Sequence, residues 1–194
     1  TILMVIFISG ILLAENFNWN TWRGPSQHSI SPESGIDIKA PYKGKVWEKN
    51  IGEGYSIVSI FEGKLFTAGH VDEKDHIYCM DAVTGKIIWD YNYEEERGTL
   101  YSGTRSTPVT DGKYVYQLSR TGILLCLSFD SGKLIWKKDV AKEYRAISPK
   151  WGFSSTPIFI DGMLVINAGQ NGMAFDPATG KPLWKNQGGL GNYA

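Results

Sequence analysis

The phrase AVTGKIIW at residues 82–89 recurs as FDSGKLIW at residues 129–136 and as PATGKPLW at residues 177–184. The tryptophans that end successive copies are 47 and 48 residues apart. A fixed period of this size is typical of an array of supersecondary units that pack on their neighbours. The phrase therefore predicts a repeat architecture and not one ordinary globular core.

Each copy contains four short apolar runs. In the second copy they lie at residues 107–110, 114–118, 123–127 and 134–136, and Asp, Gly, Ser and Arg residues separate them. Short runs rich in Val, Ile, Tyr and Leu and bounded by turn formers indicate strands joined by tight turns. Each unit is therefore expected to be one antiparallel four-stranded meander.

Units of this kind must pack on one another, because a single sheet cannot bury both of its faces. Four strands per unit and a period in the high forties are typical of a β-propeller. A helical solenoid would show apolar residues spaced by three and four, and no stretch shows them. We predict an all-β propeller of four-stranded antiparallel blades, with the Ser-Thr-Pro run innermost and the Gly-Lys-x-x-Trp run outermost. Outer-to-inner connections and second-to-third turns then share one face, where a ligand is expected.

Glycines and tryptophans recur at fixed places in the repeat. The turn glycines can take a positive φ without steric cost, and neighbouring Asp side chains can accept hydrogen bonds from turn amides. Tryptophans buried between blades supply apolar area and donate the indole N–H to a carbonyl. We assign to this framework Trp47, Gly85, Trp89, Gly132, Trp136, Gly180 and Trp184. The turn acceptors are expected to be Asp81, Asp130 and Asp176.

The pattern Ser-Ser/Thr-x-Pro, Asp-Gly, apolar strand and Asp-x-x-Thr-Gly-Lys-x-x-Trp resembles the pyrroloquinoline quinone (PQQ)-type propeller repeat from residue 44 to the end. That superfamily includes quinoprotein alcohol dehydrogenases and many propellers that bind no quinone. The stretch from Trp19 to Glu33 resembles the lead-in of a secreted subgroup. The resemblance implies a ring of about eight blades, of which we expect this sequence to hold a fragment.

The beginning of the chain has the features of a secretory signal. Residues 2–13 are apolar apart from Ser9-Gly10, and Ala14 follows. Such a run fits the hydrophobic region of a signal peptide and is short for a membrane span, which needs about 20 residues. We expect a secreted or periplasmic protein without a membrane span in the mature chain; a buried or disordered apolar segment is the alternative.

These observations divide the chain into expected segments. Residues 1–14 are a signal-peptide remnant, residues 15–43 the lead-in and residues 44–194 a partial propeller. Within the propeller we expect an outer strand of a closing blade at 44–50, blades at 51–92, 93–139 and 140–186, and the start of the next blade at 187–194.

Composition limits the partners and the covalent chemistry. Lys plus Arg and Asp plus Glu number 20 each, so no global basic field attracts nucleic acid. Cys79 and Cys126 occupy matching repeat positions; such positions share a direction, and no disulfide between them is expected. The acidic run at residues 94–96 indicates a solvated loop.

Two groups of residues lie on the expected ligand face. His70, Asp72, Asp75 and His76 surround the first second-to-third turn, where metal binding is conceivable but a hydrophilic loop is the commoner explanation, so no metal is predicted. The second group stands where inner strands begin: Tyr55, Arg105, Lys150, Trp151 and Phe153. Aromatic faces can stack on a flat ligand or sugar ring, and Arg can hold a carboxylate. Alternatively, the aromatics plug the channel and Arg105 binds loop carbonyls.

The sequence favours a secreted PQQ-like propeller that binds a protein, small molecule or carbohydrate-like ligand on its funnel face. No catalysis is evident, and no cofactor is indicated by the residues themselves. The alternative, implied by the resemblance, is a dehydrogenase that uses PQQ and Ca²⁺ for alcohols or sugars, with its active-site residues largely elsewhere. A scaffold for envelope-protein assembly is a further alternative.

Overall fold

The computed structural model describes residues 18–32, 34, 39, 41 and 44–186. The expected signal remnant at residues 1–14 and the expected start of a further blade at 187–194 lie outside the described residues. Among the described residues, no helix is long and apolar enough to cross a membrane.

The described strands form three sheets of four strands each, which confirms the predicted antiparallel meanders. The first sheet contains β1 (Ser59–Phe61), β2 (Lys64–Val71), β3 (Lys74–Asp81) and β4 (Ile87–Glu94). The second contains β5 (Val109–Thr110), β6 (Tyr114–Leu118), β7 (Ile123–Ser128) and β8 (Leu134–Asp139). The third contains β9 (Ile158–Ile160), β10 (Met163–Ala168), β11 (Asn171–Phe175) and β12 (Pro182–Lys185).

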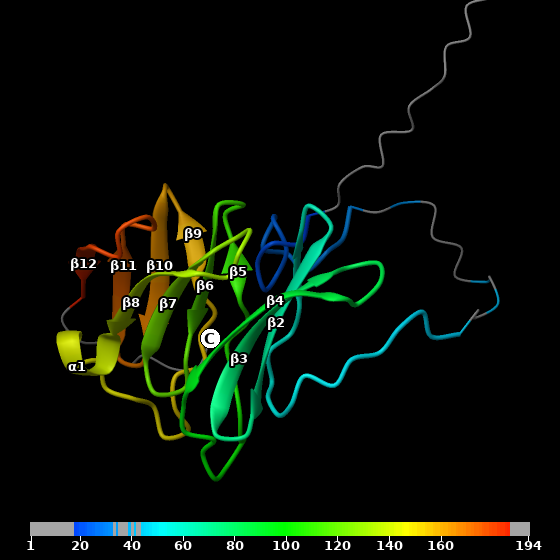
Figure 1. Ribbon diagram of the computed structural model, residues 1–194. Coiled ribbons are helices and arrows are strands. Elements are labelled where there is room, and N and C mark those ends of the chain that lie inside the picture. The colour runs from blue at the N-terminus through cyan, green and yellow to red at the C-terminus, as the bar shows by residue number, and fades with distance from the viewer. Residues whose placement is uncertain (1–17, 33, 35–38, 40, 42–43, 187–194) are drawn as a thin grey trace, which may run out of the picture.

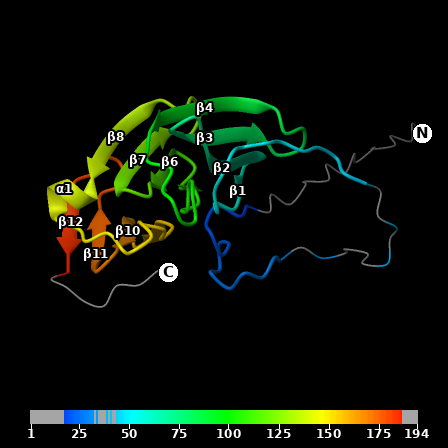
Figure 2. The same cartoon turned by 90° about the horizontal axis from the view of Figure 1, so that it is seen from below.

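The sheets fan out side by side, with β4, β8 and β12 on the outside (Figures 1 and 2). Buried side chains fill both spaces between neighbouring sheets. Phe66, Ile77 and Trp89 of the first sheet pack on Leu125 and Leu127 of the second. A second cluster joins the second and third sheets in the same way. Burial of these apolar faces is the main force that holds the blades together.

The outer strand of each blade pairs irregularly with the third strand at one repeated place. The register shifts between Cys79 and Met80, between Cys126 and Leu127, and between Ala174 and Phe175. Both cysteines are buried and free, and burial raises the pKa of each thiol to about 12. The Cys79 thiol lies in the core between the first and second blades, and the Cys126 thiol lies in the core between the second and third.

In the first and second blades, a tryptophan from the outer strand closes the space to the next blade. The indole N–H of Trp89 donates to the carbonyl of Phe129 over 3.0 Å, and that of Trp136 donates to the carbonyl of Pro177 over 2.8 Å. The Trp89 ring lies against Gly132, where an added Cβ would come within 2.6 Å of it. The framework role expected for these tryptophans accounts for both contacts.

Trp47 makes the same contact with the first blade. Its indole N–H donates to the carbonyl of Ala82 over 3.3 Å, and a Cβ on Gly85 would meet its ring at 2.6 Å. Residues 44–50 nevertheless contain no strand, so their membership of a closing blade stays a prediction. Trp184 of β12 is 43% exposed.

The Thr-Gly-Lys turns are stabilised as expected in two copies. Asp81 Oδ1 accepts from the amide of Thr84 over 2.7 Å, and Asp176 Oδ1 accepts from the amide of Thr179 over 2.8 Å. The expectation for Asp130 was wrong, because its carboxylate pairs with Lys64 at 2.9 Å. In that copy Ser128 Oγ accepts from the turn amide of Ser131 at 3.4 Å.

Two segments outside the sheets are described, the lead-in before the first blade and one short helix. The lead-in runs along the inner strands, where Trp19 exchanges backbone hydrogen bonds of 2.7 and 2.8 Å with Ile60. The next residue, Asn20, accepts from the Thr110 amide over 3.2 Å. The helix α1 (Val140–Tyr144) follows β8 and is capped by Asp139; at five residues it is too short to show helical periodicity in the sequence.

Candidate functional site

The connections from outer to inner strands and the second-to-third turns lie at the same end of the blades, as the propeller pattern predicts (Figure 1). On this face the structure gathers a group of exposed and partly exposed side chains that we call the rim cluster. Its members are Tyr55, Tyr101, Arg105, Lys150 and Trp151.

Three aromatic rings form the body of the rim cluster. Tyr101 stands edge-on to Tyr55 at a centroid distance of 6.0 Å and edge-on to Trp151 at 5.6 Å. Tyr55 is 58% exposed and Tyr101 is 51% exposed. Exposed aromatic rings that already pack on each other offer contact area at little further cost in side-chain entropy.

Two cations accompany the rings. The guanidinium of Arg105 lies 5.7 Å from the Tyr101 ring centre, and the ammonium of Lys150 lies 5.6 Å from the Trp151 ring centre. Arg105 also donates to the Trp151 carbonyl over 2.6 Å, so it has the loop-carbonyl role that was the alternative interpretation. Arg105 therefore positions Trp151, while Lys150 is exposed at the surface.

Tyr101 is a member that the sequence reasoning missed. It lies in the connection between β4 and β5, with a φ of 53°. Arg120 holds this stretch by donating to the carbonyls of Tyr101 and Leu100 over 2.7 and 3.1 Å. The aromatic residue just ahead of the Ser-Gly-Thr-Arg stretch was the available signal.

Phe153 does not belong to the surface site, contrary to the expectation. Its side chain is 1% exposed and lies in the core between the second and third blades. A Cβ on Gly122 would come within 2.7 Å of its ring, which shows how closely the turn packs on it. Its backbone amide donates to the Arg120 carbonyl, so the residue anchors the third inner strand.

A polar network supports the rim cluster from the first blade. Arg97 donates to both carboxylate oxygens of Glu53, over 2.9 and 2.7 Å, and Ser102 adds a hydrogen bond of 2.8 Å. The hydrogen bonds from Arg97 and Ser102 lower the pKa of Glu53 to about 2. These residues line a shallow hollow of about 400 Å³ that ends at Tyr55.

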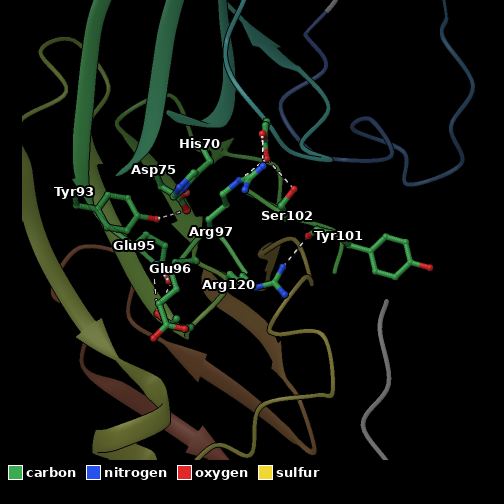
Figure 3. Close-up of polar contacts among 12 residues, drawn as sticks. His70, Asp75, Tyr93, Glu95, Glu96, Arg97, Tyr101, Ser102 and Arg120 are labelled. Carbon is green, nitrogen blue, oxygen red and sulfur yellow. Dashed lines mark hydrogen bonds and ion pairs between the residues drawn. The ribbon is translucent and has the colours of Figure 1, made fainter. Parts of the chain in front are cut away.

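A buried polar group lies deeper, between the first two blades (Figure 3). His70 Nδ1 is 2.8 Å from Asp75 Oδ1, and the Tyr93 hydroxyl donates to Asp75 Oδ2 over 3.3 Å. His70 is 4% exposed and Asp75 is 1% exposed. Burial, with the charge of Glu95 nearby, raises the pKa of Asp75 to about 6.

Glu95 corrects the expectation that residues 94–96 form a wholly solvated run. Its side chain is 7% exposed, and Oε2 accepts from the Thr121 hydroxyl over 3.0 Å. Its amide donates to the carbonyl of Glu73. Glu95 thus joins the first β2–β3 turn to the β6–β7 turn of the second blade. We call His70, Asp75, Tyr93 and Glu95 the inter-blade cluster.

The four weak metal candidates separate in space. His70 and Asp75 pair with each other, whereas His76 pairs with Asp90 at 3.0 Å; Asp72 lies in the β2–β3 turn with a φ of 49°. Among residues 18–32 and 44–186, no group of three or more His, Cys, Asp or Glu side chains could hold a metal ion.

Comparison with known proteins relates this architecture to one family. Residues 73–194 match the family described as "Outer membrane protein assembly factor BamB". The protein of that name from Yersinia pestis is 30% identical over 151 residues, which cover 72% of this chain and 35% of the relative. Quinoprotein alcohol dehydrogenase PedH from Pseudomonas putida is 26% identical over 135 residues, which cover 64% of this chain and 21% of that relative.

The fold is shared with solved quinoprotein structures. Quinohemoprotein alcohol dehydrogenase from Comamonas testosteroni superposes with a TM-score of 0.72 at 17% identity, over 87% of this chain and 27% of that chain. This likeness shows the β-propeller fold. The chain spans 35% and 21% of the length of the two curated relatives.

The described residues do not fit a quinone and Ca²⁺ site. Calcium takes six to eight oxygen ligands, usually with several carboxylates. The carboxylates nearest the rim are engaged otherwise: Glu53 binds Arg97, and Asp75 binds His70. Tyr101 meets both Tyr55 and Trp151 edge to face, so it stands parallel to neither ring and cannot sandwich a flat cofactor with one of them.

Proposed function

Because the chain belongs to the family of PQQ-like repeat propellers described as outer membrane protein assembly factor BamB, we propose that it is a binding scaffold of the cell envelope. The rim cluster carries this proposal, since it presents exposed aromatic rings and a cation on the face where the blade connections meet. The partner is a protein segment that places an apolar side chain against Tyr55 and Tyr101. The apolar run at residues 2–13 supports a secreted or periplasmic location.

Several contacts of the rim cluster support protein binding. The rings are held in place by Arg105 and by the Arg120 bonds to the carbonyls around Tyr101. A preformed aromatic surface loses little conformational entropy when it binds, and Tyr, Trp and Arg dominate binding energy at protein interfaces. Small-molecule and carbohydrate-like ligands would use the same rings and are separate outcomes of the test below.

The test places a photo-crosslinking amino acid at Tyr101 in the protein expressed with its natural neighbours in an envelope. Cross-links to one protein partner are expected from this position. The matched control is Val83, which is 73% exposed and lies in the turn between β3 and β4, at the opposite end of the blade. Equal cross-linking from both positions, or none from Tyr101, would contradict the proposal.

Affinity for the captured partner gives the quantitative prediction. Tyr101→Ala combined with Lys150→Ala is expected to weaken binding about tenfold, since truncating an interface hot spot costs about 1–2 kcal/mol or more. Val83→Ala should leave the Kd unchanged. Calorimetric titration of each purified variant with the partner measures this. An unaltered affinity of the double variant for the protein partner would contradict protein binding at the rim cluster. If the wild type then bound a sugar or a small aromatic compound there, the rim cluster would be a small-molecule site.

A further inference from the structure

The inter-blade cluster places more buried negative charge than positive charge at the base of the loop that carries Tyr101. Asp75 and Glu95 are 1% and 7% exposed, and the one imidazole near them, His70, is 4% exposed. Carboxylates removed from water are strongly destabilised unless a cation or several donors compensate them. Both donors that the structure places on the Glu95 carboxylate are neutral: the Thr121 hydroxyl bonds to Oε2 and the Glu96 amide to Oε1.

One atom of the cluster has no partner of its own. His70 Nε2 is buried and makes no hydrogen bond, while Nδ1 faces Asp75 at 2.8 Å. A neutral imidazole that donates from Nδ1 leaves Nε2 as a buried acceptor. Among the described residues, no Lys or Arg forms an ion pair with Asp75 or Glu95. A single added proton, on the imidazole or on a carboxyl group, reduces the net buried charge from two negative charges to one.

The charged and titratable groups around the cluster come from several elements. His70 comes from β2, Asp75 from β3 and Tyr93 from β4. Glu53 acts on His70 from the preceding segment, but its carboxylate is already bound by Arg97. Tyr91 on β4 faces Tyr93. The second blade contributes the Thr121 hydroxyl and, around the hollow that Glu95 lines, the charged residues Lys137, Asp139 and Lys142. The first blade adds to the same lining the charged residues Asp72, Glu73, Lys74, Glu94 and Glu96.

We propose that the inter-blade cluster is a proton-sensitive tie, that is, a contact between the first two blades that strengthens when the cluster takes up a proton. In the protonated state it holds the connection 95–105, and with it Tyr101, more firmly. Glu95 is the mechanical link, since it bonds both to the Glu73 carbonyl and to Thr121 of the neighbouring blade. Repulsion between Asp75 and Glu95 opposes these bonds when both are ionised. The effect on binding rests on the proposed function, whereas the tie itself does not.

The direction of the pH effect follows from the raised pKa of Asp75, about 6 against an ordinary value of 3.8. The folded state binds this proton more tightly than the unfolded state does. The cluster therefore contributes its full stabilisation below about pH 4, and this contribution is lost as the pH rises through about 6.

Hydrogen exchange followed by mass spectrometry tests the tie without any partner. After correction for intrinsic chemical rates, the peptide covering residues 95–105 is expected to exchange about fourfold more slowly at pH 5.5 than at pH 7.5. A carboxyl group with a pKa of about 6 in the closed state, against 3.8 when it is exposed, favours the closed state by about this factor at the lower pH. Asp75→Asn should give slow exchange at both pH values. Glu95→Gln, which keeps the side-chain shape, should do the same and serves if Asp75→Asn does not fold.

The matched control is His76→Gln, which removes the second His–Asp pair, His76 with Asp90. It should retain the full pH difference. An equal exchange rate of the wild-type protein at both pH values, or a full pH difference in both cluster variants, would overturn the proposal. Since no partner is present, failure of the rim cluster to bind a protein would leave these results unchanged.

Discussion

Gly132→Ala is expected to lower the free energy of unfolding by about 2–5 kcal/mol. The residue has a φ of 66°, and an added Cβ would lie 2.6 Å from the Trp89 ring. The left-handed backbone costs an L-residue about 1–2 kcal/mol. Forcing a methyl group into a packed interface adds about 1–3 kcal/mol. Urea unfolding of the wild type and the variant measures the difference.

Gly63→Ala separates the two contributions. Gly63 has a φ of 73°, and nothing lies within 4 Å of its added Cβ, so only the backbone cost of about 1–2 kcal/mol applies. Replacing Trp89 by Leu in the Gly132→Ala background should recover part of the additional loss, because the clash is then removed. Equal destabilisation by the two glycine substitutions would show that Trp89 does not pack tightly on the neighbouring turn.

Phe153→Ala is expected to destabilise the protein by about 3–5 kcal/mol, as for other fully buried aromatic residues. The side chain fills the space between the second and third blades and is 1% exposed. Differential scanning calorimetry should therefore show a clearly lower Tm, whether or not a ligand is present.

Tyr55→Ala is the matched control, because Tyr55 was predicted for the same role from the same place in the repeat. It is 58% exposed, and exposed substitutions usually change stability by less than about 0.5 kcal/mol. A mild effect of Phe153→Ala, together with loss of partner binding, would restore the residue to the ligand site.

The repeat predicted the blades because the features that define them are local. Turn glycines, alternating apolar runs and the recurrent tryptophan all act within one unit or between neighbours, and all three sheets have the expected strand order. The same alignment assigned Trp47 to the framework, and its ring packs at Gly85. That Ser128 replaces Asp130 as the turn acceptor could not be read from the alignment, because Asp130 is held by Lys64 from another blade. The number of blades in the ring stays a prediction.

The site was less predictable, because equivalent positions in a repeat can face different surroundings. Tyr55 and Phe153 align, yet one is exposed and the other lies in the core. The burial of Glu95 depends on the turn of the next blade, which a local charge pattern does not contain. The pairing of His70 with Asp75 needs only the β2–β3 hairpin register and could have been derived from it.

The lead-in has a consequence for the order of events during synthesis. Asn20 donates through its side-chain amide to the carbonyl of Thr110, 90 residues later in the chain. At about 5–20 residues per second, roughly 5–20 s pass between the synthesis of these partners. Trp19 can pair with Ile60 as soon as residue 60 has been made, but Asn20 must wait for Thr110. Until then the pairing of Trp19 with Ile60 lacks the support of this second contact, and a chaperone or another strand can compete for the inner edge of the first blade.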